Sequence, residues 1–339
     1  MRILIIHIGA HKTGSTSIQK FFYVYYDFYL KNYQILYPTS KEIICEFGHH
    51  YITWYFTPPD FKFDKDNLSQ AYKAFLELIS TKKDNILISS EDFIWNTRIN
   101  EFMEVVKPYF DVIYTVLYVR PQVEAALSLY QTGVVNHGMT SSFNKWFEKA
   151  IPLFDYYSIA KRFSELNCEV IVRPYKKEKF KNEDIIFDFV DTLSGILGKK
   201  LIIPEDYKPN SIKVNISLPS FITLMILFYN SQPYKDKVVP VLIELGLILR
   251  KLKPDIPTLD FVPPSMKRHI VEIYRESNKK LCEEYLGIEY LEWLSPNIEE
   301  TDEEYLRNKY PGSEIADLCK NVLDFLNQLR RDKDEKQNL

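Results

Sequence analysis

The sequence is poor in several residues that mark special classes of protein. Its 339 residues include 10 glycines and 4 cysteines, and its formal net charge is −3. So little glycine excludes a collagen-like or glycine-rich disordered chain. The cysteines are far apart and none forms a C-x-x-C pair, so neither a disulfide framework nor a zinc site is expected. The near-balanced charge argues against binding nucleic acid through bulk positive charge.

Long apolar runs are missing as well. The longest one, Leu218 to Tyr229, is well short of the roughly 20 residues that a membrane-spanning helix needs. The apolar start, Met1 to Gly9, is too short for a signal peptide and leads to Lys12 without a cleavage site. We therefore expect a cytoplasmic protein without an export signal or a membrane span, whose cysteines are reduced. Peripheral contact with a membrane surface stays open.

Strand-like and helix-like segments alternate along the first part of the chain. Apolar, β-branched runs predict strands at 3–8, 85–89, 112–119 and 169–172. Helical patterns lie at 15–31, 67–81, 98–108, 121–134, 155–166 and 183–196. Nearly continuous apolar strands are typical of a parallel sheet covered on both faces. The sequence therefore predicts an α/β fold: a three-layer parallel sheet of the P-loop type with helices on both faces.

The pattern changes after residue 217. Helices are predicted within 218–252, 265–286 and 301–330, joined by proline-rich segments. We expect an α/β core at 1–217, a C-terminal helical extension packed on it at 218–330, and a flexible charged tail at 331–339.

The segment after the first predicted strand has the composition of an anion-binding loop. Gly9 and Gly14 bracket it, Lys12 lies between them, and a helix is predicted to begin near Ser15. A loop that leads into a helix presents free backbone N–H groups and the positive end of the helix dipole. Hydroxyl groups are supplied by Thr13, Ser15, Thr16 and Ser17. These residue types together predict a binding site for a phosphate-like anion.

The loop differs from the Walker A pattern of nucleoside-triphosphate enzymes. Gly9 and Gly14 have the Walker A separation, but Ser15 stands at the lysine position and Lys12 precedes the second glycine. A kinase or ATPase uses its lysine on the β- and γ-phosphates and the next hydroxyl on Mg²⁺. The displaced lysine therefore disfavours that class.

A second candidate anion site follows the third predicted strand. Arg120 ends this strand, and Ser128 lies eight residues later, about two turns into the next predicted helix. An arginine fork and a hydroxyl suit a terminal phosphate. The alternative is a surface arginine with a serine that only contacts a neighbouring helix.

Together these segments resemble the motifs of sulfotransferases that use 3′-phosphoadenosine 5′-phosphosulfate (PAPS). The pattern H-x-G-x-x-K-T-G-[ST]-[ST]-S is similar to their 5′-phosphosulfate loop, and Arg120, Ser128 and Tyr130 have the spacing of their 3′-phosphate motif. The resemblance covers about residues 1–217. It implies an enzyme that moves a sulfonate from PAPS to a hydroxyl and releases 3′-phosphoadenosine 5′-phosphate (PAP), with no metal required. The cofactor-binding residues it implies are His11, Lys12, Thr13, Gly14, Ser15, Thr16, Ser17, Arg120 and Ser128.

The chain departs from this family in two places. Arg173-Pro174-Tyr175 stands where the family often has Tyr-Glu, so these residues receive no firm role, and the family's Arg-Lys-Gly nucleotide loop is not visible. The segment Asn215-Ile-Ser217 looks like one that some bacterial members carry after the core.

The transfer needs a general base for the acceptor hydroxyl, and Lys12 to stabilise the leaving phosphate. Glu91 follows a predicted strand and should lie at the ligand-binding edge of the sheet. His49 and His50 lie where several carbohydrate sulfotransferases carry their base. His137 is next in line, whereas His7 is expected to be structural. Family members use either Glu or His, so Glu91, His49 and His50 all stay open.

The acceptor is expected to be a carbohydrate or a glycolipid precursor, by analogy alone. Two other functions remain: a P-loop kinase or NTPase with Glu91-Asp92 on Mg²⁺, or a non-catalytic nucleotide-binding protein. No nucleic-acid partner is expected. Most of the 24 tyrosines and 22 phenylalanines are expected in the core.

Overall fold

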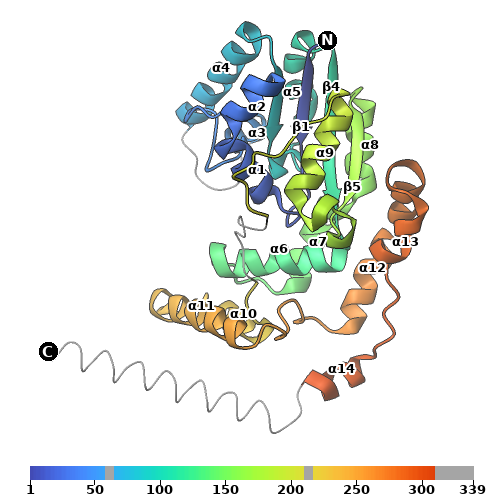
Figure 1. The fold of residues 1–339 in the computed structure, drawn as a ribbon. Coiled ribbons are helices and arrows are strands. Elements are labelled where there is room, and N and C mark those ends of the chain that lie inside the picture. The colour runs from blue at the N-terminus through green and yellow to red at the C-terminus, as the bar shows by residue number, and fades with distance from the viewer. Residues whose placement is uncertain (58–64, 210–216, 310–339) are drawn as a thin grey trace, which may run out of the picture. The chain divides into compact units, whose positions relative to one another are not determined.

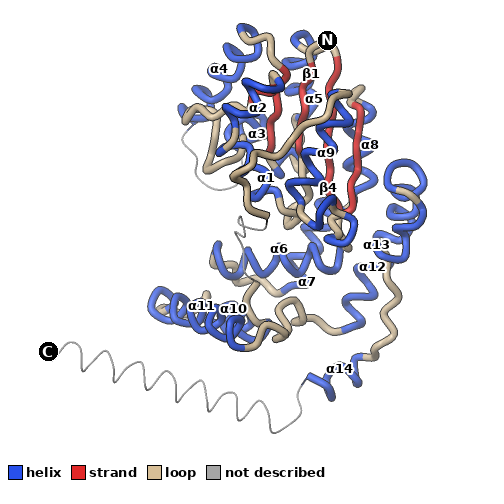
Figure 2. The backbone as a smooth tube through the Cα atoms, viewed as in Figure 1, coloured by secondary structure: helices blue, strands red, loops and turns tan. Residues whose placement is uncertain are grey.

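A parallel sheet organises the larger part of the molecule. The computed structural model describes residues 1–57, 65–209 and 217–309. Within them, one sheet has the strand order β2-β3-β1-β4-β5, and every pair is parallel (Figures 1 and 2). The strands are β1 (Ile3–His7), β2 (Ile35–Leu36), β3 (Asn85–Ser89), β4 (Val112–Val119) and β5 (Glu169–Pro174). The predicted α/β class is confirmed.

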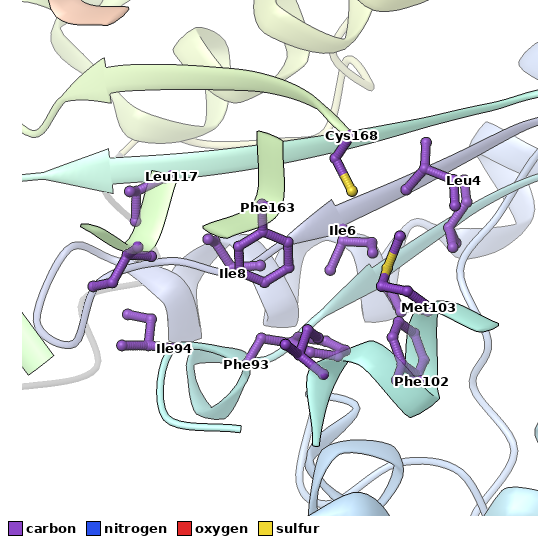
Figure 3. Packing of buried hydrophobic residues seen from close by; sticks show 14 of the residues in the cluster. Leu4, Ile6, Ile8, Phe93, Ile94, Phe102, Met103, Leu117, Phe163 and Cys168 are labelled. Atoms are coloured by element: carbon purple, nitrogen blue, oxygen red, sulfur yellow. The ribbon is translucent and has the colours of Figure 1, made fainter. Parts of the chain in front are cut away.

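Helices cover both faces of the sheet because successive residues of a strand point to opposite sides. On β1, Ile3 and Ile5 belong to one buried cluster, and Leu4 and Ile6 to the other. The first cluster includes residues of α1 (Ser15–Val24), α2 (Tyr26–Tyr33) and α9 (Ile185–Leu197). The second includes residues of α3 (His50–Phe56), α4 (Lys65–Thr81), α5 (Ile99–Val106) and α8 (Tyr156–Glu165). Figure 3 shows Leu4 and Ile6 of this second layer with Phe102, Met103 and Phe163.

The structure adds detail to the predicted elements. All four predicted strands are present, and β2 was not expected. The helix predicted at 15–31 is two helices that meet at Tyr25, which lies between them with φ −103° and ψ 21°. Helix α6 (Gln122–His137) begins after Pro121, so the proline caps the helix and is not its first residue. Helices α3 and α7 (Phe143–Ala150) were not predicted.

The helices described after residue 217 follow the predicted ranges, except α13, which was not predicted. They are α10 (Ser220–Tyr229), α11 (Lys235–Leu252), α12 (Pro264–Leu281), α13 (Leu291–Leu294) and α14 (Asp302–Lys309). Gln131 of α6 donates its amide to the Leu218 carbonyl and to Thr223, at 2.9 and 2.7 Å. These hydrogen bonds attach α10 to the helix that follows β4.

The chain divides into two compact units. The larger unit is Met1–Phe261 with Ile270–Pro296, and the smaller is Val262–His269 with the residues from Asn297 on. The predicted tail at 331–339, the predicted helix beyond residue 309, and Asn215 lie outside the described residues. Among the helices of the described ranges, none has the length and apolar character to cross a membrane.

Candidate functional site

A cavity lies where the carboxyl ends of the strands meet. Within the sheet, β2 and β3 lie on one side of β1, and β4 and β5 lie on the other side. The direction in which the chain adds strands therefore reverses beside β1. Ligands of open α/β sheets bind at such a point. A cavity of about 870 Å³ opens there. The predicted residues that line it are His11, Lys12, Gly14, Ser15, Thr16, Ser17, His50, Glu91, Arg120, Ser128 and His137.

The loop after β1 is held in a conformation that turns it into α1. The Ala10 N–H donates to the Tyr118 carbonyl of β4, which extends the strand pairing into the loop. Lys12 then has φ +68° and Gly14, the residue before α1, has φ +81°. Lysine rarely adopts this left-handed conformation, and such residues cluster at functional sites. The Thr13 hydroxyl is turned inward and donates to the Ala10 carbonyl at 2.5 Å, so this side chain does not line the cavity.

Several buried polar atoms around this loop have no hydrogen-bond partner in the structure. They include Ser15 Oγ, His11 Nε2 and Arg120 Nε. A Cβ atom on Gly9 would lie 2.5 Å from Ser15 Oγ, so only glycine fits beside this serine. Leaving a buried polar group unpaired costs about 1–3 kcal/mol. All three residues line the cavity, and their unpaired atoms provide hydrogen-bonding capacity for a bound ligand.

Two cationic side chains lie together at the loop. Arg120 donates from Nη1 to the Lys12 carbonyl at 2.9 Å and pairs through Nη2 with Glu124 at 2.7 Å. Its guanidinium lies over the Tyr175 ring, 5.7 Å from the centroid. Burial and the positive charge of Arg120 lower the pKa of Lys12, and Glu91 only partly opposes this. Because the two cations repel each other, the arrangement is complementary to an anion.

Ser128 lines the same cavity as these two cations. It lies on α6, is 6% exposed, and lines the cavity together with Lys12 and Arg120. Thus the two predicted anion-binding motifs, separated by more than 100 residues in the sequence, meet at one cavity.

Glu91 and His50 form a polar group at the end of β3. Gln19 donates its amide to Glu91 Oε2 at 2.9 Å, and His50 Nε2 lies 4.0 Å from the same oxygen. His50 Nδ1 lies 2.9 Å from Asp92 Oδ2. Burial alone would lower the pKa of His50, but Asp92 and the other nearby carboxylates outweigh it and raise this pKa. The pKa of Asp92 is lowered in turn, because His50 outweighs the effect of burial on this carboxyl.

His49 has a different position from His50. It is fully buried and does not line the cavity. Its Nδ1 accepts the Ser89 N–H at 3.0 Å, so Nε2 carries the proton and donates to the Pro38 carbonyl at 3.0 Å. Burial lowers its pKa to about 3. The structure therefore gives His49 the role of joining the end of β3 to the segment after β2, and does not support its prediction as a base.

Replacing His49 with alanine should lower the free energy of unfolding by about 2–4 kcal/mol, because two buried backbone groups lose their partner. Denaturant unfolding measures this loss. In the wild type the unfolded state gains a proton on His49 below about pH 6.5, whereas the folded state does not until about pH 3. The free energy of unfolding should therefore decrease as the pH is lowered from about 6.5 to about 3. This decrease should be less steep in the variant. The exposed His269 provides a control, since its replacement should change neither quantity.

Other residues named from the sequence have structural partners. The Tyr130 hydroxyl donates to the Ser141 carbonyl at 2.6 Å, away from the cavity. Arg173 pairs with Asp188 at 2.5 Å. His7 is buried with Nδ1 2.8 Å from Ser89 Oγ, as expected for a structural residue.

Sequence reasoning missed several residues of the cavity wall. Tyr175 lies beside both Arg120 and Gly14, where a Cβ on the glycine would be 3.1 Å from its ring. Trp54 and Trp95 also line the cavity. Asp92 lines it too, and the sequence named it only for the kinase alternative. In the part of the chain that the structure describes, no three His, Cys, Asp or Glu side chains gather as a metal site.

Comparisons with known proteins give limited likenesses. No protein-family model matches the chain. An uncharacterized protein of Archaeoglobus fulgidus is 31% identical over 211 residues, which are 60% of this chain and 54% of that protein. The chain thus spans about half the length of this curated relative. Among solved structures, a sulfotransferase from Alicyclobacillus acidocaldarius matches with a TM-score of 0.41 and 16% identity, over 72% of this chain and 96% of that one. Neither likeness assigns a family, so the function is argued from the chain's own residues.

Proposed function

We propose that the protein is a sulfotransferase that moves a sulfonate group from PAPS to a hydroxyl. The observation that carries this proposal is the meeting of two cation-and-hydroxyl pairs, Lys12 with Ser15 and Arg120 with Ser128, in one cavity that also holds Glu91. A nucleotide with anionic groups at both its 5′ and 3′ positions uses both pairs at once.

The residues present suit such a donor. Ser15 Oγ and Arg120 Nε are buried and without partners, one at each anion site. Lys12, Ser15 and the first amides of α1 would hold the 5′ end, and Arg120 with Ser128 would hold the 3′-phosphate. When bound, PAPS would supply a sulfonate that is activated by its attachment to a phosphate.

The chain's own residues would provide the acid–base and charge chemistry. Glu91 accepts the proton of the acceptor hydroxyl, and Gln19 and His50 hold this carboxylate in place. We choose Glu91 over His50 because the raised pKa of His50 keeps its ring protonated over more of the pH range. Lys12 stabilises the negative charge that grows on the leaving phosphate.

The acceptor and the location are part of the same proposal. We propose a carbohydrate hydroxyl, free or on a glycolipid, and a cytoplasmic enzyme. The described cysteines, Cys45, Cys168 and Cys282, are all free thiols, which suits a reducing compartment.

The kinase alternative has less support. It would recruit Glu91 and Asp92 as ligands for Mg²⁺, but Asp92 already accepts hydrogen bonds from His50, Trp54 and Trp95. A magnesium ligand needs oxygen lone pairs that are available to the metal.

Calorimetric titration and thermal unfolding of the protein, each with PAP and with ATP–Mg²⁺, test the proposal. PAP is expected to bind more tightly and to raise the melting temperature more, because only PAP has a 3′-phosphate for Arg120. Equal or stronger binding of ATP–Mg²⁺ would contradict the sulfotransferase proposal. Turnover of labelled PAPS separates an enzyme from a non-catalytic nucleotide-binding protein.

The variant Arg120→Ala locates the 3′-phosphate in the same titration. Its affinity for PAP should fall by about 2–4 kcal/mol, roughly 30- to 1000-fold, because a charge-assisted pair is lost. Adenosine 5′-phosphosulfate lacks the 3′-phosphate and serves as the control, since its affinity should change little. An equal loss for both ligands would mean that Arg120 acts only by supporting the loop through Lys12.

A further inference from the structure

One part of the cavity wall differs in chemistry from the anion-binding loop. It is formed by the segment around Glu46, by α3, and by the 3₁₀ turn Glu91–Phe93 that follows β3, together with Trp95 just after this turn. Beside Cys45 and His50, the lining residues here are three carboxylates and two indoles, namely Glu46, Glu91, Asp92, Trp54 and Trp95. We call these five residues the acidic–aromatic wall.

Asp92 fixes the two indoles of this wall. It is 8% exposed and accepts the Trp54 Nε1–H at 2.7 Å and the Trp95 Nε1–H at 3.0 Å. The Nε1–H is the one polar group of each indole, and in both rings it is bound to this carboxylate. The remaining ring atoms are apolar. Trp95 is 47% exposed, so it is not a core residue, and its ring centroid lies 5.2 Å from that of His11 in the loop. The wall therefore continues directly from the loop.

The charge of the wall is negative. Three carboxylates, those of Glu46, Glu91 and Asp92, act on the single ring of His50. Even with His50 protonated and with Lys12, on which Glu91 also acts, three carboxylates outnumber two positive charges. An anionic group at this place would be repelled, whereas hydroxyl and ammonium groups can donate to the carboxylates.

We propose that the acidic–aromatic wall is the acceptor subsite and that it binds a sugar ring without negative charge. This inference rests on the proposed sulfotransferase function. The apolar face of a neutral or amino sugar packs on Trp95, and its hydroxyls reach Glu46 and Glu91. Sugars that carry a carboxylate, phosphate or sulfate at this position are rejected.

Three methyl β-glycosides that share the gluco configuration and differ in charge test the proposal. They are the glucoside, the 2-amino-2-deoxyglucoside and the glucuronide, and their binding to the PAP-saturated protein is measured by ligand-observed NMR. The neutral and amino sugars are expected to bind at least roughly tenfold more tightly than the glucuronide. Equal or tighter binding of the glucuronide, or binding of none of the three, overturns the proposal. The separate titration with PAP shows whether the donor site, and thus the proposed function, stands.

Two variants locate the subsite. Trp95→Ala should weaken binding of the neutral glycoside at least roughly tenfold and leave PAP binding unchanged. Its control is Tyr234→Ala, an aromatic ring of similar exposure, 49%, outside the cavity lining. Glu46→Gln should narrow the difference in binding affinity between the glucoside and the glucuronide. The control is Glu148→Gln, at an exposed carboxylate of α7 outside the cavity lining, which should leave this difference unchanged. Wild-type glycoside binding by Trp95→Ala would remove the subsite from this wall.

Discussion

Replacement of Glu91 with glutamine is expected to lower kcat by roughly 10²- to 10⁴-fold, the usual contribution of a general base. Glutamine has nearly the shape of glutamate and still offers an oxygen to the Gln19 amide, which donates to Glu91 at 2.9 Å. The fold and the binding of PAP should therefore stay unchanged. Turnover of labelled PAPS with a sugar acceptor, measured beside PAP titration, separates the two effects. Glu101→Gln, at an exposed position on α5, is the matched control.

The contrary result points to His50. If Glu91→Gln turns over normally and His50→Gln does not, the imidazole is the base. Asp92→Asn distinguishes the two cases through the pH profile, because asparagine lacks the negative charge by which Asp92 helps to raise the pKa of His50. The variant should lower the pKa of His50. If protonated His50 supports Glu91 as the base, the alkaline limb of the pH profile moves to lower pH. If neutral His50 is itself the base, the acidic limb moves to lower pH instead.

The sheet was predictable because its strands are buried on both faces. β1 is buried at all five positions, so its sequence is a continuous apolar run. β2 has two residues, too few to show any period. The break at Tyr25 between α1 and α2 was also invisible, since neither proline nor glycine marks it. Helix α3 spans seven residues, His50–Phe56, and is too short for a clear helical pattern.

The two predicted anion-binding motifs could be recognised because each is local in the sequence. A glycine, a lysine and hydroxyls near a helix start specify their own geometry, and Arg120 needed only its place at the end of a strand. The choice between His49 and His50 was not predictable. The two are neighbours in sequence, and their roles depend on Ser89, Pro38 and Asp92, which belong to other segments. Only tertiary structure turns one ring into the core and the other toward the cavity.

Lys12→Ala is expected to lower kcat by roughly 10²-fold or more, on the scale of losing one preorganised electrostatic donor. In the proposed mechanism the lysine stabilises charge that develops only in the transition state, so kcat should fall more than the affinity for PAP. Ser15 and the amides at the start of α1 still contribute to ground-state binding. Single-turnover kinetics and PAP titration measure the two quantities. Lys20→Ala, a lysine of α1 that does not line the cavity, is the control.

The same variant should be at least as stable as the wild type when no ligand is bound. Burial and the charge of Arg120 lower the pKa of Lys12, which means that its positive charge is less favourable in the folded protein than in the unfolded chain. Alanine removes this charge and has the same backbone strain at φ +68°, since both residues carry a Cβ. Thermal unfolding of the ligand-free protein should therefore give an equal or higher melting temperature together with impaired turnover. Unchanged or higher stability together with lower activity is expected where a residue serves catalysis at a cost to stability. Normal turnover of Lys12→Ala would contradict the mechanism, and a large loss of stability would show instead that the lysine mainly supports the loop.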